Sequence, residues 1–386
     1  MHAIERADSI AALRDLAKRR LPRPVFDFMD GGADEEISLS RNLGDLRQVE
    51  LTPRVLRDVS ARDNASPILG RTGGLPLIIA PTGLAALGWP KADILLARAA
   101  GRRGVPFVIS TSSSVRIEDI AAEAGQTRLW FQVYVYKDRD LVRSLVERAS
   151  ACGVEALVLT VDTPVLGWRR RDHANRFTVP LRPDLAMAVE FARCWRWTLD
   201  IARFGSPKMQ NFVEAGQSSD IVSLAQLMTR NMDASVTWRE VAWLRDLWPG
   251  PLILKGVSSA ADAQEAVRQG IDAIWISNHG GRQLDGSPST VSALPAIAQA
   301  VDGRAEIYLD GGIRSGGDIA KVLALGAQAA AVGRATLFGV SAGGEAGADR
   351  ALSILNQELD RCLALMGLTS PMQLDRDCVR TPERRG

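Results

Sequence analysis

The stretch DAIWISNHGGRQLD, residues 272–285, contains the pattern that decides the fold. It opens with the apolar run AIWIS (273–277), in which consecutive residues are hydrophobic, as in a strand buried on both faces. Polar residues and two glycines follow at once, and His279 among them is one of only three histidines in the chain. A buried strand that ends in polar side chains is typical of a parallel sheet with chemistry at its edge.

The same unit occurs eight times along the chain. Apolar runs that we interpret as buried parallel strands occupy residues 76–81, 106–110, 129–136, 156–162, 251–256, 273–277, 306–310 and 329–333. Helical patterns with apolar residues at i, i+3 and i+4 lie between them and end at glycine. Strict alternation requires parallel strands with crossover helices, so eight units predict a (β/α)8 TIM barrel. A doubly wound open sheet is the alternative, but no GxGxxG motif opens the first unit.

Two segments fall outside the repeat. We expect a single domain over residues 1–386, with a helical N-terminal preface (1–70), a barrel (71–180 and 236–370) and a long insertion or lid (181–235). The insertion follows the fourth strand, where the separation between strands is far longer than elsewhere.

Composition excludes several classes of protein. The net charge of +2 gives no bulk electrostatic signal for nucleic acid, so no such partner is expected. The four cysteines form no CxxC pair or Cys/His cluster, so neither a metal site nor a disulfide framework is expected. The N-terminus lacks the apolar core of a signal peptide, and no run reaches 18 apolar residues. We therefore expect a cytoplasmic protein without a transmembrane helix.

The candidate site residues are the polar residues at the strand ends, because chemistry in a TIM barrel lies at the C-terminal ends of its strands. In chain order they are Pro81, Thr82, Gly83, Ser110, Gln132, Tyr134, Thr160, Asp162, Arg169, Lys255, Ser277, His279, Arg282, Asp310, Gly312, Arg314, Gly333 and Arg334. Any one of them is ordinarily a cap or a surface ion pair. Their convergence on one rim is typical of an active site.

The last two strand ends predict a phosphate site. The segment DGGIRSGGD (310–318) offers glycine backbone N–H groups, and the helix after it would add its dipole. Arg314 and Arg334 add positive charge. Phosphate binding after the seventh and eighth strands is common in TIM barrels.

Together these motifs resemble the FMN-dependent 2-hydroxy acid oxidases and dehydrogenases, which include glycolate oxidase, L-lactate dehydrogenase and (S)-mandelate dehydrogenase. The similarity covers nearly the whole chain, and LTVDTP (159–164) with SNHGGRQLD (277–285) is its most specific part. The stretch NMDASVTWREVAWLRDLWPG (231–250) resembles the mandelate and lactate dehydrogenase branch most.

The resemblance implies FMN as cofactor and a role for each matched residue. The flavin ring and ribityl chain would contact Pro81, Thr82, Gly83, Ser110, Gln132, Thr160, Lys255 and Ser277, and the phosphate end Asp310, Gly312, Arg314, Gly333 and Arg334. Arg169 and Arg282 would bind the substrate carboxylate, as suits a bidentate guanidinium. His279 would be the base, oriented by Asp162, and Tyr134 would hydrogen-bond near the substrate hydroxyl.

The implied reaction is oxidation of an (S)-2-hydroxy acid, mandelate-like or lactate-like, to the 2-oxo acid. Electrons would pass from FMN to a quinone or another acceptor. An oxidase that uses O2 and a non-redox FMN-binding barrel enzyme are the alternatives. The resemblance also implies a homo-oligomer, since members of the family are often tetramers.

The chain departs from the family pattern at two positions. Phe28, in VFDF (25–28), stands where a substrate-contacting tyrosine is usual, unless it is a core aromatic. Gly83 stands where several oxidases carry alanine, which favours an acceptor other than O2.

The insertion carries aromatic residues interleaved with cations, a composition that suits a membrane interface. They are Phe191, Trp195, Trp197 and Phe204 among Arg182, Arg193, Arg196, Arg203 and Lys208. In the mandelate dehydrogenase branch this segment is thought to dock on the membrane and to deliver electrons to quinone. The resemblance therefore implies peripheral attachment to the inner face of the cell membrane, and a lid over the active site is the alternative.

Overall fold

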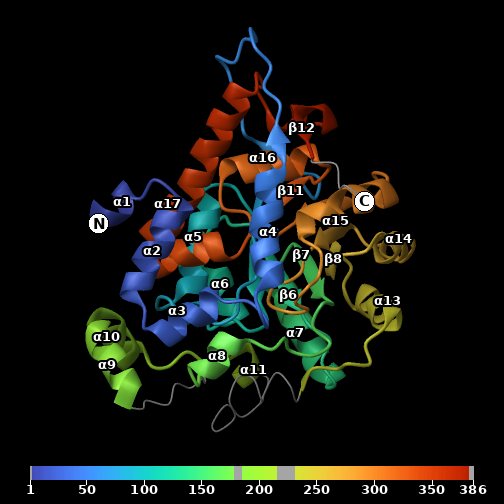
Figure 1. Cartoon of the computed structure of the whole chain (residues 1–386). Helices are drawn as coiled ribbons and strands as arrows, with labels where there is room; N and C mark the ends of the chain where they lie inside the picture. The colour runs from blue at the N-terminus through green and yellow to red at the C-terminus, as the bar shows by residue number, and fades with distance from the viewer. Residues whose placement is uncertain (1, 178–184, 215–230, 382–386) are drawn as a thin grey trace.

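The computed structural model describes residues 2–177, 185–214 and 231–381. Eight parallel strands form a closed barrel with helices around it (Figure 1). The strands are β4 (Leu77–Ile79), β5 (Phe107–Ser110), β6 (Leu129–Val133), β7 (Ala156–Thr160), β8 (Leu252–Val257), β9 (Ala273–Ile276), β10 (Glu306–Leu309) and β11 (Ala329–Val332). Each pairs with the next in sequence, and β11 pairs with β4 to close the ring. The predicted TIM barrel is confirmed.

Burial on both faces explains the continuous apolar runs. One set of side chains fills the barrel interior, including Val108, Trp130, Val158, Ile253 and Trp275. The alternate residues face outward and join the larger core between the barrel and the helices. Both faces therefore favour hydrophobic residues, as is usual for a parallel sheet covered by helices.

The crossover helices follow the strands in regular order. They are α5 (Ala92–Arg102), α6 (Ile117–Glu123), α7 (Arg139–Ala151), α13 (Trp238–Leu247), α14 (Ala260–Arg268), α15 (Thr290–Val301), α16 (Gly316–Ala324) and α17 (Arg334–Leu365). Side-chain oxygens cap several of their N-termini, as with Ser259 of α14 and Ser289 of α15. The backbone of α17 is interrupted at Gly343 and Gly344.

The preface folds against the mouth of the barrel. Its helices are α1 (His2–Arg6), α2 (Ile10–Arg20), α3 (Arg23–Asp30) and α4 (Ile37–Gln48). The turn after β9 holds the preface in place, because Gly281 O accepts from Ala33 N at 2.9 Å and Asp285 accepts from the backbone N–H of Ser38 at 2.7 Å. The side-chain amides of Asn42 and Asn278 pair reciprocally beside them.

Short strands tie the remaining segments together. β1 (Glu50–Leu51) pairs with β12 (Val379–Arg380), so the segment just after α4 lies beside the end of the described chain. β2 (Ser66–Ile68) and β3 (Arg71–Gly73) form an antiparallel hairpin. Single 3-10 turns are η1 (Ala85–Leu87), η2 (Pro371–Gln373) and η3 (Arg376–Cys378).

The third barrel strand is shorter than the prediction of 129–136, which was wrong at its C-terminal end. β6 ends at Val133, where its pairing with β7 stops. Beyond it the chain pairs with the end of the insertion instead, through a bridge between Tyr136 and Met232. Tyr134 consequently lies just after the strand, on the rim of the barrel.

After β7 the chain forms α8 (Arg170–Ala174), and the predicted insertion then contains α9 (Leu185–Arg193), α10 (Trp195–Phe204) and α11 (Gln210–Glu214). Parts of the predicted insertion, including Arg182, lie outside the described residues. α10 is attached to the side of the barrel, since the Trp197 indole donates to Leu87 O at 2.7 Å and Asp200 pairs with Arg20. Among the described residues, no helix is long and apolar enough to cross a membrane.

Candidate active site at the strand ends

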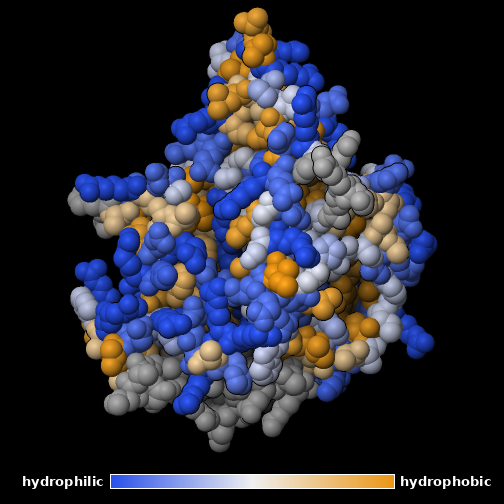
Figure 2. Space-filling model, viewed as in Figure 1, coloured by the Kyte–Doolittle hydropathy of each residue, from blue (hydrophilic) through white to orange (hydrophobic). Residues whose placement is uncertain are grey.

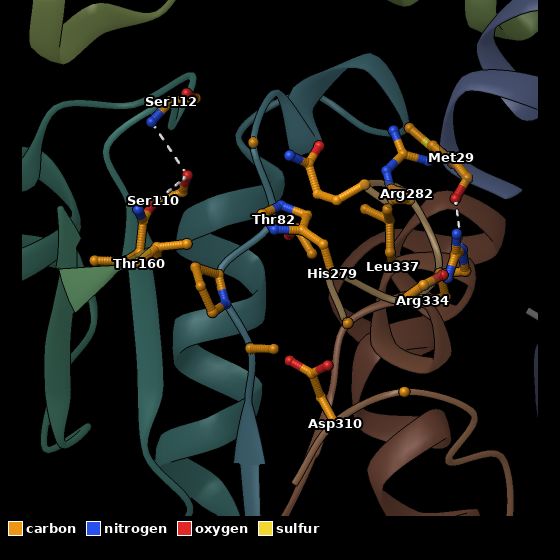
Figure 3. Close-up of a pocket in the computed structure, with 18 of the residues that line it drawn as sticks. Met29, Thr82, Ser110, Ser112, Thr160, His279, Arg282, Asp310, Arg334 and Leu337 are labelled. Carbon is orange, nitrogen blue, oxygen red and sulfur yellow. Dashed lines mark hydrogen bonds between the residues drawn. The ribbon is translucent and has the colours of Figure 1, made fainter. Parts of the chain in front are cut away.

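A cavity of about 300 Å³ opens at the C-terminal ends of the strands, and residues at all eight strand ends line it (Figure 3). The structure brings together nearly the whole predicted set. The predicted residues on its wall are Phe28, Pro81, Thr82, Gly83, Ser110, Gln132, Tyr134, Thr160, Arg169, Lys255, His279, Arg282, Asp310, Gly312, Arg314, Gly333 and Arg334. Asp162 and Ser277 lie behind that wall, in contact with residues that form it.

His279 occupies a left-handed turn directly after β9, with φ 57°. This conformation is uncommon for a residue with a side chain and often occurs at functional sites. Nδ1 of His279 lies 3.0 Å from Oδ1 of Asp162, and its backbone N–H donates to Ser277 Oγ at 3.1 Å. The Nδ1 contact fixes the ring orientation, so Nε2 is the nitrogen left for a substrate.

Asp162 reaches His279 because Gly256 of β8 leaves room for it. A Cβ atom at Gly256 would stand 2.7 Å from Cβ of Asp162. Burial alone would raise the pKa of Asp162, but the charge and hydrogen bond of His279 hold that pKa below its ordinary value. Asp162 is therefore an anion that accepts the Nδ1–H of the imidazole.

Arg169 and Arg282 bring two positive charges to the same cavity. Burial lowers the pKa of Arg282, and the positive charges of Arg169 and Arg334 lower it further. Burial also lowers the pKa of Arg169, with partial compensation from Asp172. Among the described residues, no protein group accepts a hydrogen bond from the buried Nε of Arg169. Two half-buried guanidinium groups with one carboxylate, Asp172, near them leave excess positive charge that suits an anion.

Phe28 lies between these two arginines. The guanidinium carbons of Arg282 and Arg169 lie 5.3 and 6.0 Å from the centroid of its ring. Its ring stacks on Phe177, with the centroids 4.8 Å apart. The side chain is half-buried and forms part of the cavity wall, while its inner edge packs on the hydrophobic core.

A buried polar chain crosses three neighbouring strand ends. Lys255 Nζ donates to Ser277 Oγ at 2.9 Å, and Ser277 Oγ donates to Asp310 at 2.8 Å. Lys255 Nζ also lies 3.4 Å from the Asp310 carboxylate. Further round the wall, Nε2 of Gln132 and Oγ1 of Thr160 are buried and find no partner in the described part of the chain. Such orphaned groups require a polar ligand to satisfy them.

The glycine turn after β10 forms the opposite end of the cavity with Arg314 and Arg334. Gly312 has φ 92°, and a Cβ there would stand 2.4 Å from Asn42 O. Burial lowers the pKa of Arg314 to about 10 and that of Arg334 to about 9. Two half-buried arginines on one cavity wall indicate a place for an anionic group.

One element of the predicted phosphate site is wrong. The N-terminus of α16 is already occupied, because Asp318 accepts from the N–H groups of Arg314 and Ser315 and Glu358 accepts from that of Gly316. The dipole that faces the cavity is that of α17, whose N-cap Gly333 lies on the wall.

Sequence reasoning missed several residues of the wall. They include Met29, Ser112, Thr163, Leu166, Asp172, Phe177, Gln283 and Leu337. Asp172, three residues after Arg169 in a cationic run, is the one that carried a signal. Burial raises its pKa, and Arg282 and Arg169 oppose that rise. The apolar residues carried no signal that separates them from core residues.

The chain matches the family model of the FMN-dependent dehydrogenases over residues 17–381. The chain belongs to this family. It is 42% identical to (S)-mandelate dehydrogenase of Pseudomonas putida, over 95% of this chain and 92% of that protein. It is 41% identical to L-lactate dehydrogenase of Caulobacter vibrioides, over 93% and 94% of the two chains.

Solved structures agree with this assignment. A crystal structure of (S)-mandelate dehydrogenase, described as a monotopic membrane protein, has a TM-score of 0.92 and 42% identity and covers 97% of this chain and 100% of that one. A mandelate oxidase structure has a TM-score of 0.83 and 36% identity, with 96% and 97% coverage. The predicted family and its mandelate and lactate dehydrogenase branch are confirmed, and so is FMN as the cofactor.

The cavity fits FMN on its own chemistry. The orphaned amide of Gln132 and hydroxyl of Thr160 can hydrogen-bond a heterocycle, while Arg314 and Arg334 offer charge for a phosphate at the other end. Lys255 lies on β8, which in the barrel order separates β7, the strand of Thr160, from β9 and β10.

Proposed function

We propose that this dehydrogenase oxidises an (S)-2-hydroxy acid, mandelate-like or lactate-like, to the corresponding 2-oxo acid. The observation that carries the proposal is the His279–Asp162 pair in one cavity with Arg169 and Arg282. An anion clamp beside a positioned base matches a substrate that has a carboxylate next to an ionisable hydroxyl.

When bound, FMN supplies the acceptor for the two electrons that leave the substrate. Its ring and ribityl chain would lie against Pro81, Thr82, Gly83, Ser110, Gln132, Thr160, Lys255 and Ser277. The phosphate end of FMN would meet Asp310, Gly312, Arg314, Gly333 and Arg334. Lys255 places a positive charge where it would stabilise an anionic reduced ring.

Protein residues would bind the substrate and accept its proton. Arg169 and Arg282 hold the substrate carboxylate, and Nε2 of His279 takes a proton from the substrate. Asp162 stabilises the imidazolium that results, because its carboxylate is already an anion at the Nδ1 side. Burial raises the pKa of Tyr134, so its phenol stays protonated and can donate a hydrogen bond near the substrate oxygen.

Apolar side chains next to Arg169 and Arg282 favour a substrate with a hydrophobic side chain. Phe28 and Phe177 form a stacked pair on the wall, and Leu166 lines the same cavity. A wall of this kind suits an aryl or a short alkyl group, which agrees with the relatives' names.

Anaerobic titration of the purified flavoprotein tests this function. We expect the oxidised flavin absorbance to bleach on addition of mandelate or lactate, and we would compare glycolate and 4-hydroxymandelate in the same series. A spectrum that none of these acids changes would contradict the proposal and favour a non-redox FMN enzyme. Reoxidation of the reduced protein by O2 and by a quinone analogue, measured side by side, separates an oxidase from a dehydrogenase.

We also propose that α9 and α10 dock on the membrane surface, where the acceptor would be a quinone. Val189, Trp195, Leu199 and Phe204 are exposed there by 56–68%. Arg196 and Arg203 accompany them, each over a neighbouring aromatic ring. Figure 2 shows apolar side chains at the lower left corner, where Figure 1 places α9 and α10. Exposed apolar groups next to cations suit an interfacial helix pair.

The position of these helices supports docking over the alternative of a lid. None of the described residues 185–214 lines the cavity. The segment lies instead beside the preface, where Glu190 accepts from Arg23 N at 3.0 Å. The relative described as a monotopic membrane protein is consistent with this proposal.

Sedimentation with anionic lipid vesicles tests the docking. The variant Trp195→Ser/Leu199→Ser/Phe204→Ser should lose vesicle binding while substrate still reduces its flavin. The matched control is Val55→Ser/Leu56→Ser, which removes two exposed apolar side chains after β1. Equal vesicle binding by the parent and the α10 variant would refute the docking proposal. The predicted homo-oligomer stays a prediction, and light scattering of the purified protein would test it.

A further inference from the structure

The C-terminal turn of α3 holds both ends of the site through its backbone. Arg282 Nη1 donates to Phe28 O at 2.8 Å and to Gly31 O at 2.7 Å. Arg334 donates to Met29 O at 3.1 Å and, through Nη2, to the same Gly31 O at 2.8 Å. One carbonyl oxygen therefore connects the proposed substrate arginine with the proposed phosphate arginine.

This turn is a natural acceptor for cations. The last carbonyl groups of an α-helix have no partners within the helix and carry the negative end of its dipole. Arg282 and Arg334 are both half-buried, and the positive charge of Arg334 lowers the pKa of Arg282. Backbone carbonyls are thus the groups that keep two repelling guanidinium groups close together.

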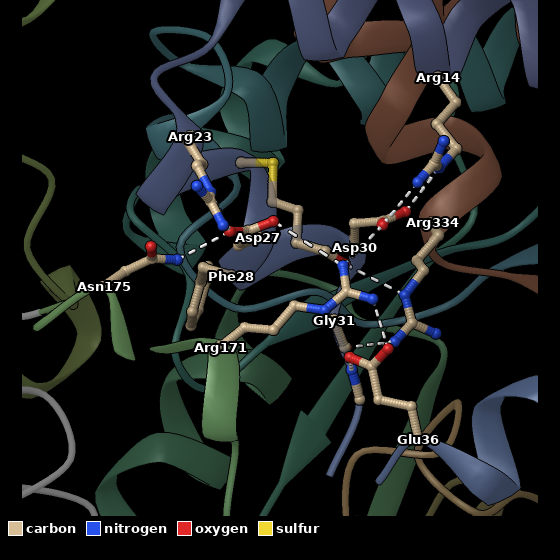
Figure 4. Close-up of polar contacts among 12 residues, drawn as sticks. Arg14, Arg23, Asp27, Phe28, Asp30, Gly31, Glu36, Arg171, Asn175 and Arg334 are labelled. Carbon is tan, nitrogen blue, oxygen red and sulfur yellow. Dashed lines mark hydrogen bonds and ion pairs between the residues drawn. The ribbon is translucent and has the colours of Figure 1, made fainter. Parts of the chain in front are cut away.

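The carboxylate of Asp30 ties the turn to two neighbouring helices. Asp30, the last residue of α3, is buried and accepts from Nε and Nη2 of Arg14 at 2.7 Å each. It also accepts from Arg171 at 3.3 Å, and Arg171 pairs with Glu36 beyond it (Figure 4). Helices α2 and α8 and the start of α4 therefore converge on the residue between Met29 and Gly31.

Asp30 also supplies charge to the site without lining it. It is absent from the cavity wall, and yet its negative charge raises the pKa of both Arg314 and Arg334 against the effect of burial. Burial alone would raise the pKa of Asp30 itself, but the hydrogen bonds and charge of Arg14 keep that pKa below its ordinary value. The carboxylate is therefore ionised at neutral pH.

We infer that Asp30 is a positioning residue for this enzyme, which sets Arg282 and Arg334 together through the carbonyl groups of Phe28, Met29 and Gly31. The inference rests on the proposed function, since it takes Arg282 as a substrate ligand and Arg334 as a cofactor ligand. It adds a group outside the cavity on which both substrate binding and cofactor retention depend.

The test is Asp30→Asn in the holoenzyme, with rates expressed per bound flavin. The amide keeps the size of the side chain but loses the charge and one of the two acceptors for Arg14. We expect kcat/KM to fall about tenfold, because a clamp displaced by a fraction of an ångström orients the substrate poorly. We also expect FMN to dissociate faster in dialysis, since Arg334 loses its support.

The control is Asp15→Asn, which removes an exposed carboxylate 3.9 Å from the same Arg14. It should leave kcat/KM and flavin retention unchanged. Arg14→Lys approaches the pair from its other side and covers the case in which Asp30→Asn does not fold. A lysine cannot make the bidentate contact, so a smaller loss of kcat/KM in the same direction is expected.

Two results would overturn the inference. One is a lower melting temperature for Asp30→Asn while its kcat/KM and flavin retention stay within twofold of the parent. If only Arg14→Lys folds, the same result for that variant counts instead. The other is an equal loss of kcat/KM in Asp15→Asn. Arg282→Lys in the same assay keeps the two proposals distinguishable. If the KM of Arg282→Lys is also unchanged, Arg282 does not bind the substrate carboxylate and the proposed function fails. If Arg282→Lys raises KM while Asp30→Asn changes nothing, Arg282 binds the substrate but Asp30 does not position it.

Discussion

Both carboxylate oxygens of Asp162 face one ring nitrogen of His279, with Nδ1 lying 3.0 Å from Oδ1 and 3.2 Å from Oδ2. A carboxylate in this position selects the tautomer with hydrogen on Nδ1. It thereby leaves the lone pair of Nε2 as the basic site of the cavity. The base and its orienting partner lie just after two different strands, β9 and β7, so formation of the barrel brings them together.

Replacing His279 by alanine should leave FMN bound and stop reduction of the flavin by substrate. Loss of a positioned general base lowers rates by about 10²–10⁴-fold. Stopped-flow absorbance under anaerobic conditions measures the step. His173→Ala, at an exposed position in α8, is the control and should be reduced at the parental rate. Parental reduction of the His279 variant would assign the proton transfer to another group.

Arg282→Lys should weaken substrate binding and slow reduction together. An ammonium group cannot reproduce the fork that spans the carbonyl groups of Phe28 and Gly31 and still faces the cavity. Steady-state kinetics should show a higher KM and a lower kcat. If both constants are unchanged, the substrate carboxylate binds elsewhere.

Phe28→Tyr should lower the KM for a 2-hydroxy acid. The ring lies on the cavity wall between two guanidinium groups, so a new hydroxyl would be available to the bound carboxylate. A hydrogen bond to a charged group contributes roughly 1.5–3 kcal/mol, which is about tenfold or more in affinity.

A matched control for this change lies on the same helix. Phe26 is buried against Phe338 and does not line the cavity, so Phe26→Tyr adds a buried hydroxyl and should lower the melting temperature without changing KM. If Phe28→Tyr also lowers the melting temperature and leaves KM unchanged, Phe28 packs in the core and does not contact the substrate.

Asp93 makes part of the stability depend on pH. Complete burial in the first turn of α5 raises its pKa to about 6, although hydrogen bonds from Ser113 and Ser114 oppose the rise. The unfolded chain loses this proton near pH 4 and the folded chain near pH 6. The contribution of Asp93 to stability is therefore greatest below that window, decreases as pH rises through it, and stays constant above it.

Asp93→Asn should remove this component. The difference corresponds to on the order of 3 kcal/mol at most, since one pKa unit is about 1.4 kcal/mol. Melting temperatures of the variant and the parent should be measured from pH 4 to pH 7. As pH rises, the melting temperature of the variant should increase relative to that of the parent. A constant difference across that range would show that Asp93 does not titrate there.

The sequence predicted the barrel well because both faces of each strand are buried, which leaves a continuous apolar run at every strand. It also predicted most of the site, because strand ends meet on one rim whatever the details of packing. The end of β6 was wrong for a tertiary reason, since Tyr136 pairs with Met232 rather than with the next barrel strand.

The remaining errors have the same origin. The capping box of Ser315 and Asp318 is visible in SGGD, but nothing local shows that Glu358 accepts from Gly316 at the start of α16. The contacts of Asp30 with Arg14 and Arg171 join positions 16 and 141 residues apart, so no periodic pattern reveals them. Motif reasoning finds residues that touch the ligand, whereas residues that hold those residues are visible only after folding.

The pairing of β1 with β12 has a consequence for how the molecule is made. A ribosome delivers Met29 and Gly31 long before Arg334, which lies 303 residues beyond Gly31, and β12 arrives later still. Contacts at such separations close slowly, because a long loop must be ordered before they form. The turn at Met29 and Gly31 is thus the first part of the site to be synthesised and among the last to bind its partner, Arg334. A nascent chain that stops short of the eighth strand has neither a closed barrel nor a completed site.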